Sequence, residues 1–99
     1  MGPQTVVFSI EEERITVSCP DATRLVEVLH RLGFDSCLSA AKKIECASEL
    51  HTQVPIVELA IGEDECVLAA LSDLRATGDF LQPLVRLERV VTARIEKTS

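Results

Sequence analysis

The clearest pattern of apolar and polar positions runs from Ile15 to Asp35, and it predicts a strand, a turn, a helix and a helix stop. Apolar Ile15, Val17 and Cys19 alternate with small polar residues, which is the period-two pattern of a strand with one buried face. The rest of the chain can be arranged around this unit.

The helix of this unit has start and stop signals as well as an apolar stripe. Ser18 and Asp21 have the spacing of a capping box, and Asp21 places an acid at the positive end of the helix dipole. Gly33 stands where a left-handed residue ends a helix. The apolar stripe, with spacings of three and four, consists of Ala22, Leu25, Leu29 and Leu32.

Two further segments have strand patterns. Thr5–Ile10 alternates, and the acidic tip Glu11–Glu13 separates it from Arg14–Cys19, so the two segments predict a hairpin. Val54–Ile61 is almost continuously apolar, which is typical of a strand buried on both faces.

A second helix is predicted to open at Gly62 and to end near Gly78. Three acids occupy its first turn, where the helix dipole favours them. Its apolar stripe consists of Val67, Ala70, Leu71 and Leu74. A strand–helix pattern therefore occurs twice in the chain.

Residues 36–48 and 84–96 fit either a strand or a helix. As a helix, the first segment would bury Cys37, Ala41, Ile44 and Ala47, and its Ala-Ala-Lys-Lys run has high helix propensity. As a helix, the second would bury Leu84, Leu87, Val91 and Ile95. We expect strands in both, the first because the sheet would otherwise lack strands, the second because of Pro83 and a Val-Val-Thr run.

This order of elements predicts one α+β domain over residues 1–99. The expected fold is a ferredoxin-like, split βαβ two-layer sandwich: an antiparallel sheet with two helices on one face and an extra N-terminal strand. Ligand-sensing ACT modules, metallochaperones and nucleic-acid binders share that order, so the fold does not decide the function. ACT modules usually carry a glycine just after the Asp that follows their first strand, whereas Ala22 and Thr23 stand there in this chain.

Charge and hydropathy disfavour two classes of partner. The formal net charge is −6 and the only aromatic residues are three phenylalanines, so the cations and stacking surfaces of a nucleic-acid binder are missing. No apolar run is long enough to span a bilayer, and no secretory signal pattern is visible. We expect a cytoplasmic protein.

The four cysteines, Cys19, Cys37, Cys46 and Cys66, are widely spaced, without the close pairs of a zinc site. We expect reduced thiols that pack like small apolar side chains, with no metal and no cofactor. Cys19 alone has a position that could activate a thiol, at a helix start before Pro20. His30 lies eleven residues further on, about 16 Å along the helix axis, and nothing in the sequence brings His51 to Cys19.

We therefore expect a non-catalytic binding or assembly module that acts through protein–protein contacts. Apolar residues of both strand parities would leave a patch on the uncovered face of the sheet, and a homodimer would cover it. The residues predicted for this interface are Val57, Leu59, Val90 and Val91.

Two alternatives belong to other function classes. A small-molecule-sensing regulatory domain of ACT-like architecture would bind a ligand at the 18–23 turn, where free backbone N–H groups can hold an anion. Its site residues would be Ser18, Cys19, Asp21 and Thr23. A thiol-dependent enzyme would use Cys19 as its nucleophile.

Overall fold

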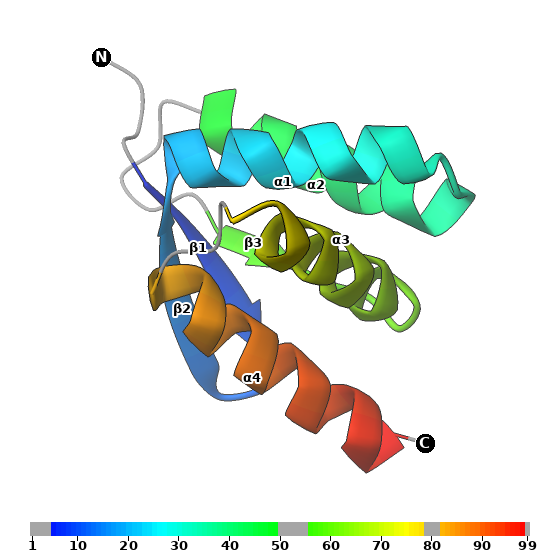
Figure 1. The fold of residues 1–99 in the computed structure, drawn as a ribbon. Coiled ribbons are helices and arrows are strands. Elements are labelled where there is room, and N and C mark those ends of the chain that lie inside the picture. The colour runs from blue at the N-terminus through cyan, green and yellow to red at the C-terminus, as the bar shows by residue number, and fades with distance from the viewer. Residues whose placement is uncertain (1–4, 50–55, 79–81, 99) are drawn as a thin grey trace.

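The computed structural model describes residues 5–49, 56–78 and 82–98. Three strands and four helices follow in the order ββααβαα (Figure 1). The strands are β1 (Thr5–Ile10), β2 (Glu13–Ser18) and β3 (Ile56–Glu58). The helices are α1 (Cys19–Leu32), α2 (Asp35–Glu49), α3 (Glu63–Thr77) and α4 (Gln82–Thr98).

The sheet is mixed, with the strand order β2-β1-β3. β1 and β2 form the predicted antiparallel hairpin, in which Phe8 lies opposite Ile15. β3 pairs with β1 in parallel, so that Val57 flanks Phe8 on the other side. Alternation along β1 buries one face of the sheet, on which Val6, Phe8 and Ile10 lie.

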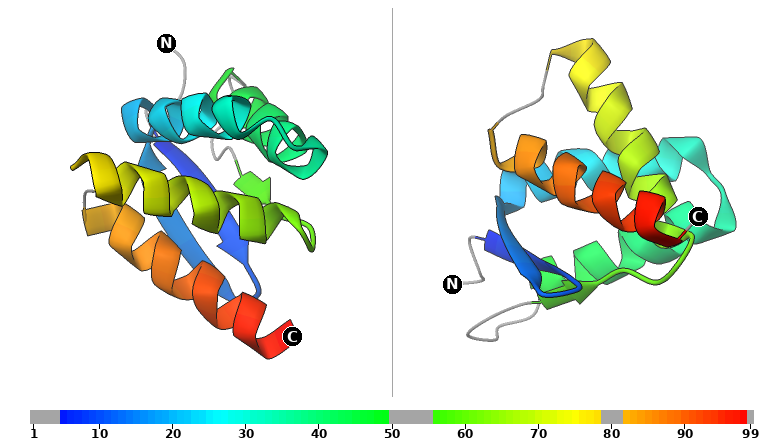
Figure 2. Two further views of the ribbon diagram at one scale, coloured as in Figure 1. Left: turned by 45° about the vertical axis from the view of Figure 1, so that its right-hand side comes forward. Right: turned by 90° about the horizontal axis from the view of Figure 1, so that it is seen from below.

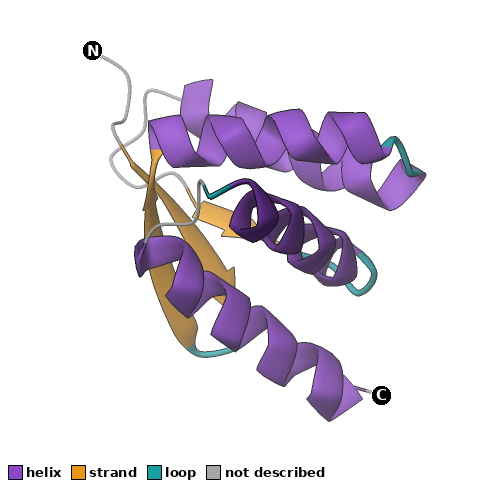
Figure 3. Cartoon of the chain, viewed as in Figure 1, coloured by secondary structure: helices purple, strands orange, loops and turns teal. Residues whose placement is uncertain are grey.

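All four helices lie on the buried side of the sheet (Figures 2 and 3). Within the described ranges, α1, α2 and α4 contact the strands, whereas α3 packs against the other three helices. One continuous apolar core joins the strands to all four helices. No helix in residues 5–49, 56–78 and 82–98 is both long enough and apolar enough to cross a membrane.

The first helix follows the prediction from the sequence. Ser18 is its N-cap and accepts a hydrogen bond from the N–H of Asp21, as expected for the capping spacing. Gly33 ends it in the left-handed conformation with φ 75°, and its N–H donates to the carbonyl of Leu29. Leu25 and Leu29 on the predicted stripe are fully buried.

The strand predictions for residues 36–48 and 84–96 are wrong, because both segments are helical. In α2 the helical alternative describes the buried face, where Cys37, Ala41, Ile44 and Ala47 lie. The helical structure of this segment agrees with its high helix propensity. The segment adds no strand, and the sheet has three strands in the described residues. In α4, Leu84, Leu87 and Val91 are buried at helical spacing. Pro83 is compatible with this helix because proline is tolerated in a first turn, where N–H groups have no intrahelical partner.

The α+β class is confirmed, whereas the ferredoxin-like arrangement is not. In the described residues the sheet has three strands and a parallel β1–β3 pair, and α1, α2 and α4 pack against it while α3 packs on those helices. The predicted strand Val54–Ile61 is reduced to β3, and its first two residues lie outside the described residues.

Candidate functional site

At the 18–23 turn, which was predicted to bind a ligand, side chains of the turn hydrogen-bond to groups of the turn itself. The Ser18 hydroxyl donates to Oδ2 of Asp21 at 2.8 Å and accepts from the Asp21 N–H at 3.3 Å. Asp21 is buried there, so a carboxylate already lies at the helix N-terminus where an anionic ligand would bind. Thr23 is exposed on the first turn of α1. The turn therefore has the features of a helix cap.

Cys19, the proposed thiol nucleophile, is the first residue of α1 and packs partly against the core. His30 lies eleven residues along the same helix and bonds to Glu45 on α2, with Nε2 and Oε1 2.9 Å apart. The other histidine, His51, lies outside the described residues. The described structure therefore brings neither histidine to this thiol.

Three of the four residues predicted for the dimer interface lie in the core of the single chain. Val57 is 1% exposed, Leu59 4% and Val91 0%. Val57 is on the helix-covered face of the sheet, and Val91 is on a helix that packs against the sheet. Only Val90 is half-buried, on α4 rather than on a strand. An interface on the outer face of the sheet therefore needs other residues.

The uncovered face of the sheet is small and mixed in character. Val7, Thr16 and Ile56 lie at its centre, and Arg14 and Glu58 lie toward one end. Three strands of six residues or fewer span about 14 Å by 20 Å, or roughly 280 Å². A stable interface buries about 800 Å² on each partner. A dimer through this face stays a prediction, and the three described strands present only a small surface for it.

The acids at the start of α3 are tied to two other helices. Glu63 accepts hydrogen bonds from Lys43 Nζ at 2.6 Å and from the Ala60 N–H at 2.7 Å, and the Ser39 hydroxyl also donates to it. Burial acts to raise the pKa of Glu63, but these three donors and the charge of Lys43 outweigh burial and lower that pKa. Glu63 thus links α2 to the loop between β3 and α3.

Asp64 forms the corresponding link to α4. Its carboxylate accepts from the N–H groups of Gly62 and Glu65, and its Oδ2 lies 3.3 Å from Nε of Arg94. The Arg94 guanidinium also donates to the carbonyl of Leu59 at 2.7 Å. From the sequence, the helix dipole alone explained these acids. In the structure, Glu63 and Asp64 also link α2, α3 and α4 to the loop before α3.

A groove of about 800 Å³ lies between α2 and β3. One wall is a single face of α2, and the other is the backbone and side chains of residues 56–60. Its lining includes Ser39, Lys42, Lys43, Cys46, Ala47, Ile56, Val57, Glu58, Leu59 and Ala60. The volume is within the range of ligand-binding clefts in proteins, roughly 300–1,000 Å³.

Charge and exposure distinguish this groove from the acidic protein around it. Lys43 is held by Glu63 and by the carbonyl of Glu58, so it is fixed at the rim. Lys42 is exposed beside it, and Ile56 is 42% exposed although it is a large apolar residue. Cys46, the exposed cysteine among the four, lies on the α2 wall.

The strand expected over residues 36–48 would not form this groove, so the groove was not predicted from the sequence. In a helix, Lys42, Lys43 and Cys46 lie on one side at spacings of three and four, opposite the buried stripe. The helical alternative for residues 36–48 would have placed Lys42, Lys43 and Cys46 on one exposed side.

The described residues contain no group of three or more His, Cys, Asp or Glu side chains placed to hold a metal ion. No protein-family model matches this chain. Comparisons with curated proteins and with solved structures find no match either.

Proposed function

We propose that this protein is a non-catalytic protein-interaction module that takes an extended segment of a partner protein into the groove between α2 and β3. The observation that carries the proposal is the groove itself, which combines an edge strand, an apolar floor and a rim with two lysines. Within residues 5–49, 56–78 and 82–98, the lining offers apolar area, backbone groups and charge.

The strand order makes β3 a suitable docking edge. Within the described residues β3 pairs with β1 alone and is an edge of the sheet, and Lys43 donates to the carbonyl of Glu58 on this strand. An added extended segment bonds to the backbone of such an edge and places alternate side chains in pockets beside it. Ile56, which is 42% exposed, offers apolar area beside this edge, whereas Ala47, Val57 and Leu59 form the buried base of the groove.

The charge at the rim of the groove indicates which residues the partner segment contains. Lys42 stands at the rim with its side chain exposed, and Lys43 lies next to it. Lys43 is already ion-paired with Glu63 and Glu58 also lines the groove, so the exposed Lys42 is the cation that favours an acidic side chain in the partner segment. The occupant we propose is therefore an extended segment with alternating apolar and acidic residues.

A second copy of the chain is the competing occupant. Two β3 edges related by a twofold axis would extend the sheet across a dimer, an arrangement different from the face-to-face dimer expected from the sequence. The ligand-sensing alternative at the 18–23 turn has less support, because Ser18 and Asp21 already bond to each other there.

The test is selection of a random peptide library displayed on phage against the wild-type protein. Cys46→Arg fills the α2 wall of the groove at an exposed position, and Thr23→Arg places the same side chain at an exposed site on α1. We expect the selected peptides to bind wild type and Thr23→Arg equally and to bind Cys46→Arg at least about tenfold more weakly. Equal binding to all three proteins would place the peptide site elsewhere.

Charge reversal tests the expected composition. Lys42→Glu should weaken the selected acidic peptides, whereas Arg89→Glu on α4 makes the same change in net charge away from the groove. Sedimentation of the wild type without peptide tests whether a second copy of the chain binds in the groove. A wild-type dimer that Cys46→Arg converts to folded monomers would show that the groove accepts a second copy.

A further inference from the structure

The two faces of β3 present different side chains to a segment that adds to its edge. Val57 is buried on the face that the helices cover, whereas Ile56 and Glu58 are exposed on the uncovered face of the sheet. Residues directly opposite each other on neighbouring strands lie on the same face, and successive residues alternate between the faces. An added segment therefore meets α2 with one set of alternate side chains and Ile56 and Glu58 with the other set.

The direction of α2 determines where its side chains lie along β3. Ser39 on α2 and the N–H of Ala60 after β3 donate to the same buried carboxylate. Lys43, about one helical turn after Ser39, donates to the carbonyl of Glu58. Residue numbers thus rise along α2 as they fall along β3, so the two elements run in opposite directions (Figure 1). Lys42 precedes Lys43 by a rise of about 1.5 Å, so it lies at about the level of Glu58.

Two exposed side chains of opposite charge stand at this edge, one on each face. Lys42 and Glu58 both line the groove and both are exposed. Among the hydrogen bonds and ion pairs of the described residues, Glu58 takes part through its backbone carbonyl and not through its carboxylate. Lys43 differs, because it is ion-paired with Glu63 at 2.6 Å. The α2 side of the edge therefore offers a cation, and the uncovered face offers an anion next to the apolar Ile56.

We propose that Lys42 and Glu58 select the partner segment from opposite faces. This inference rests on the proposed function and specifies the sequence of the segment. The segment residue opposite Glu58 is basic, and the residue two positions from it, beside Ile56, is apolar. An acidic residue adjacent to the basic one points to the other face, toward Lys42.

The signs of the charges disfavour the reverse arrangement. An acidic residue on the uncovered face would lie beside Glu58, and a basic residue on the α2 side would lie beside Lys42. Like charges at opposed positions of neighbouring strands are destabilising, whereas opposite charges there are favourable. Because side chains alternate along a strand, the acidic and basic residues of the segment are separated by an odd number of positions. The arrangement thus predicts the order of residues in the segment as well as its composition.

The experiment repeats the phage selection on wild type, Glu58→Lys and Lys42→Glu, and compares the enriched sequences position by position. On wild type we expect adjacent basic and acidic residues, with an apolar residue two positions from the basic one. On Glu58→Lys the basic position should become acidic, and on Lys42→Glu the acidic position should become basic. In each case the other two positions should be retained.

Two control variants make the same charge changes at exposed positions away from the groove. Glu12→Lys, on the hairpin between β1 and β2, matches Glu58→Lys, and Arg89→Glu on α4 matches Lys42→Glu. Both controls should enrich the wild-type sequence.

Fluorescence anisotropy with a synthetic peptide of the enriched wild-type sequence measures the affinities. Glu58→Lys should bind this peptide about three- to tenfold more weakly, and replacing the basic residue of the peptide by glutamate should restore the binding to Glu58→Lys. Glu58→Gln removes the charge with little change in volume and should weaken binding about two- to fivefold. Circular dichroism confirms that the variants are folded.

Two outcomes would overturn this inference while the groove remains the peptide site. One is enrichment of the same sequences on wild type and Glu58→Lys, by peptides that bind Cys46→Arg more weakly. The other is a set of such peptides in which the acidic and basic residues are two positions apart. If no peptide is enriched on wild type, or if Cys46→Arg binds the selected peptides as wild type does, the proposed function itself fails, and this inference fails with it.

Discussion

Phe8→Ala should lower the free energy of unfolding by about 3–5 kcal/mol, the usual cost of removing a buried aromatic ring. Phe8 is fully buried on the central strand, between Ile15 on β2 and Val57 on β3. Removal of the ring leaves a cavity that both neighbouring strands and the covering helices line. Denaturant unfolding followed by circular dichroism measures the change.

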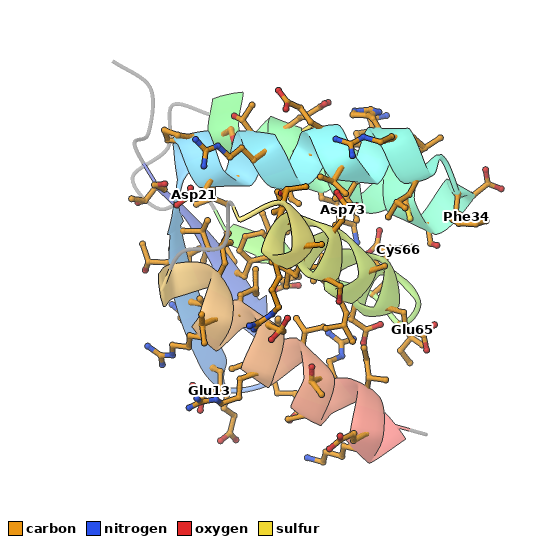
Figure 4. The ribbon with its side chains drawn as sticks, viewed as in Figure 1. Glu13, Asp21, Phe34, Glu65, Cys66 and Asp73 are labelled. Atoms are coloured by element: carbon orange, nitrogen blue, oxygen red, sulfur yellow. The ribbon has the colours of Figure 1, made fainter. Side chains whose placement is uncertain are left out.

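Phe34→Ala is the matched control, because the same atoms are removed from a side chain that is 68% exposed. Phe34 lies at the turn between α1 and α2 (Figure 4). We expect a change within about 0.5 kcal/mol there. Equal losses in the two variants would mean that Phe8 is not at the centre of the core.

Glu63→Gln should destabilise the protein by about 1–3 kcal/mol at pH 7, which is typical of a charged hydrogen-bonded group that loses its charge. The side chain is 4% exposed and accepts from Ser39, Lys43 and the Ala60 N–H. Glutamine keeps the volume but leaves Lys43 without its ionic partner. Glu65→Gln is the control, since Glu65 is in the same first turn and is exposed.

The pH dependence of the wild type should reflect the lowered pKa of Glu63. Its ordinary pKa is 4.5, and the native donors hold it below that value. The native state therefore binds fewer protons at this group than the unfolded state. The stability it contributes is fully present above pH 4.5 and is lost as the pH falls from 4.5 through the lowered native pKa.

The two glutamine variants separate this contribution from the other carboxylates. Unfolding free energies of wild type, Glu63→Gln and Glu65→Gln are compared at neutral pH and at several values below 4.5. The difference between wild type and Glu63→Gln should shrink on acidification, whereas Glu65→Gln should follow the wild type throughout. A constant difference over that range would show that Glu63 titrates as an ordinary glutamate.

The features predicted correctly are those that short-range interactions specify. The β1–β2 hairpin depends on alternation over neighbouring residues, and α1 depends on Ser18, Asp21 and Gly33 within one short stretch. The stripe of α3 repeats the same spacing, and Val67, Ala70, Leu71 and Leu74 are all buried as expected. In α1 the cap, the stripe and the C-terminal glycine all indicate the same element.

The errors arose where one segment satisfies two periodicities. Residues 36–48 and 84–96 contain apolar positions that fit a strand or a helix, so local pattern could not decide between them. The expected topology favoured a strand for 36–48, and Pro83 with the Val-Val-Thr run favoured one for 84–96. The resulting sheet predicted exposed positions for residues that are buried in the monomer. Once 84–96 is a helix on the sheet, Val91 becomes part of the core.

By itself, the sequence determined the hairpin, the capped first helix and the apolar face of the third, because the interactions that specify them join residues close in the chain. The parallel pairing of β3 with β1, the groove between α2 and β3 and the contacts of Glu63 with Ser39 and Lys43 are visible only in the folded chain. These features depend on how α2 and α3 pack, and so join residues far apart in sequence. The sequence contains the side chains for such contacts but no local signal of their pairing.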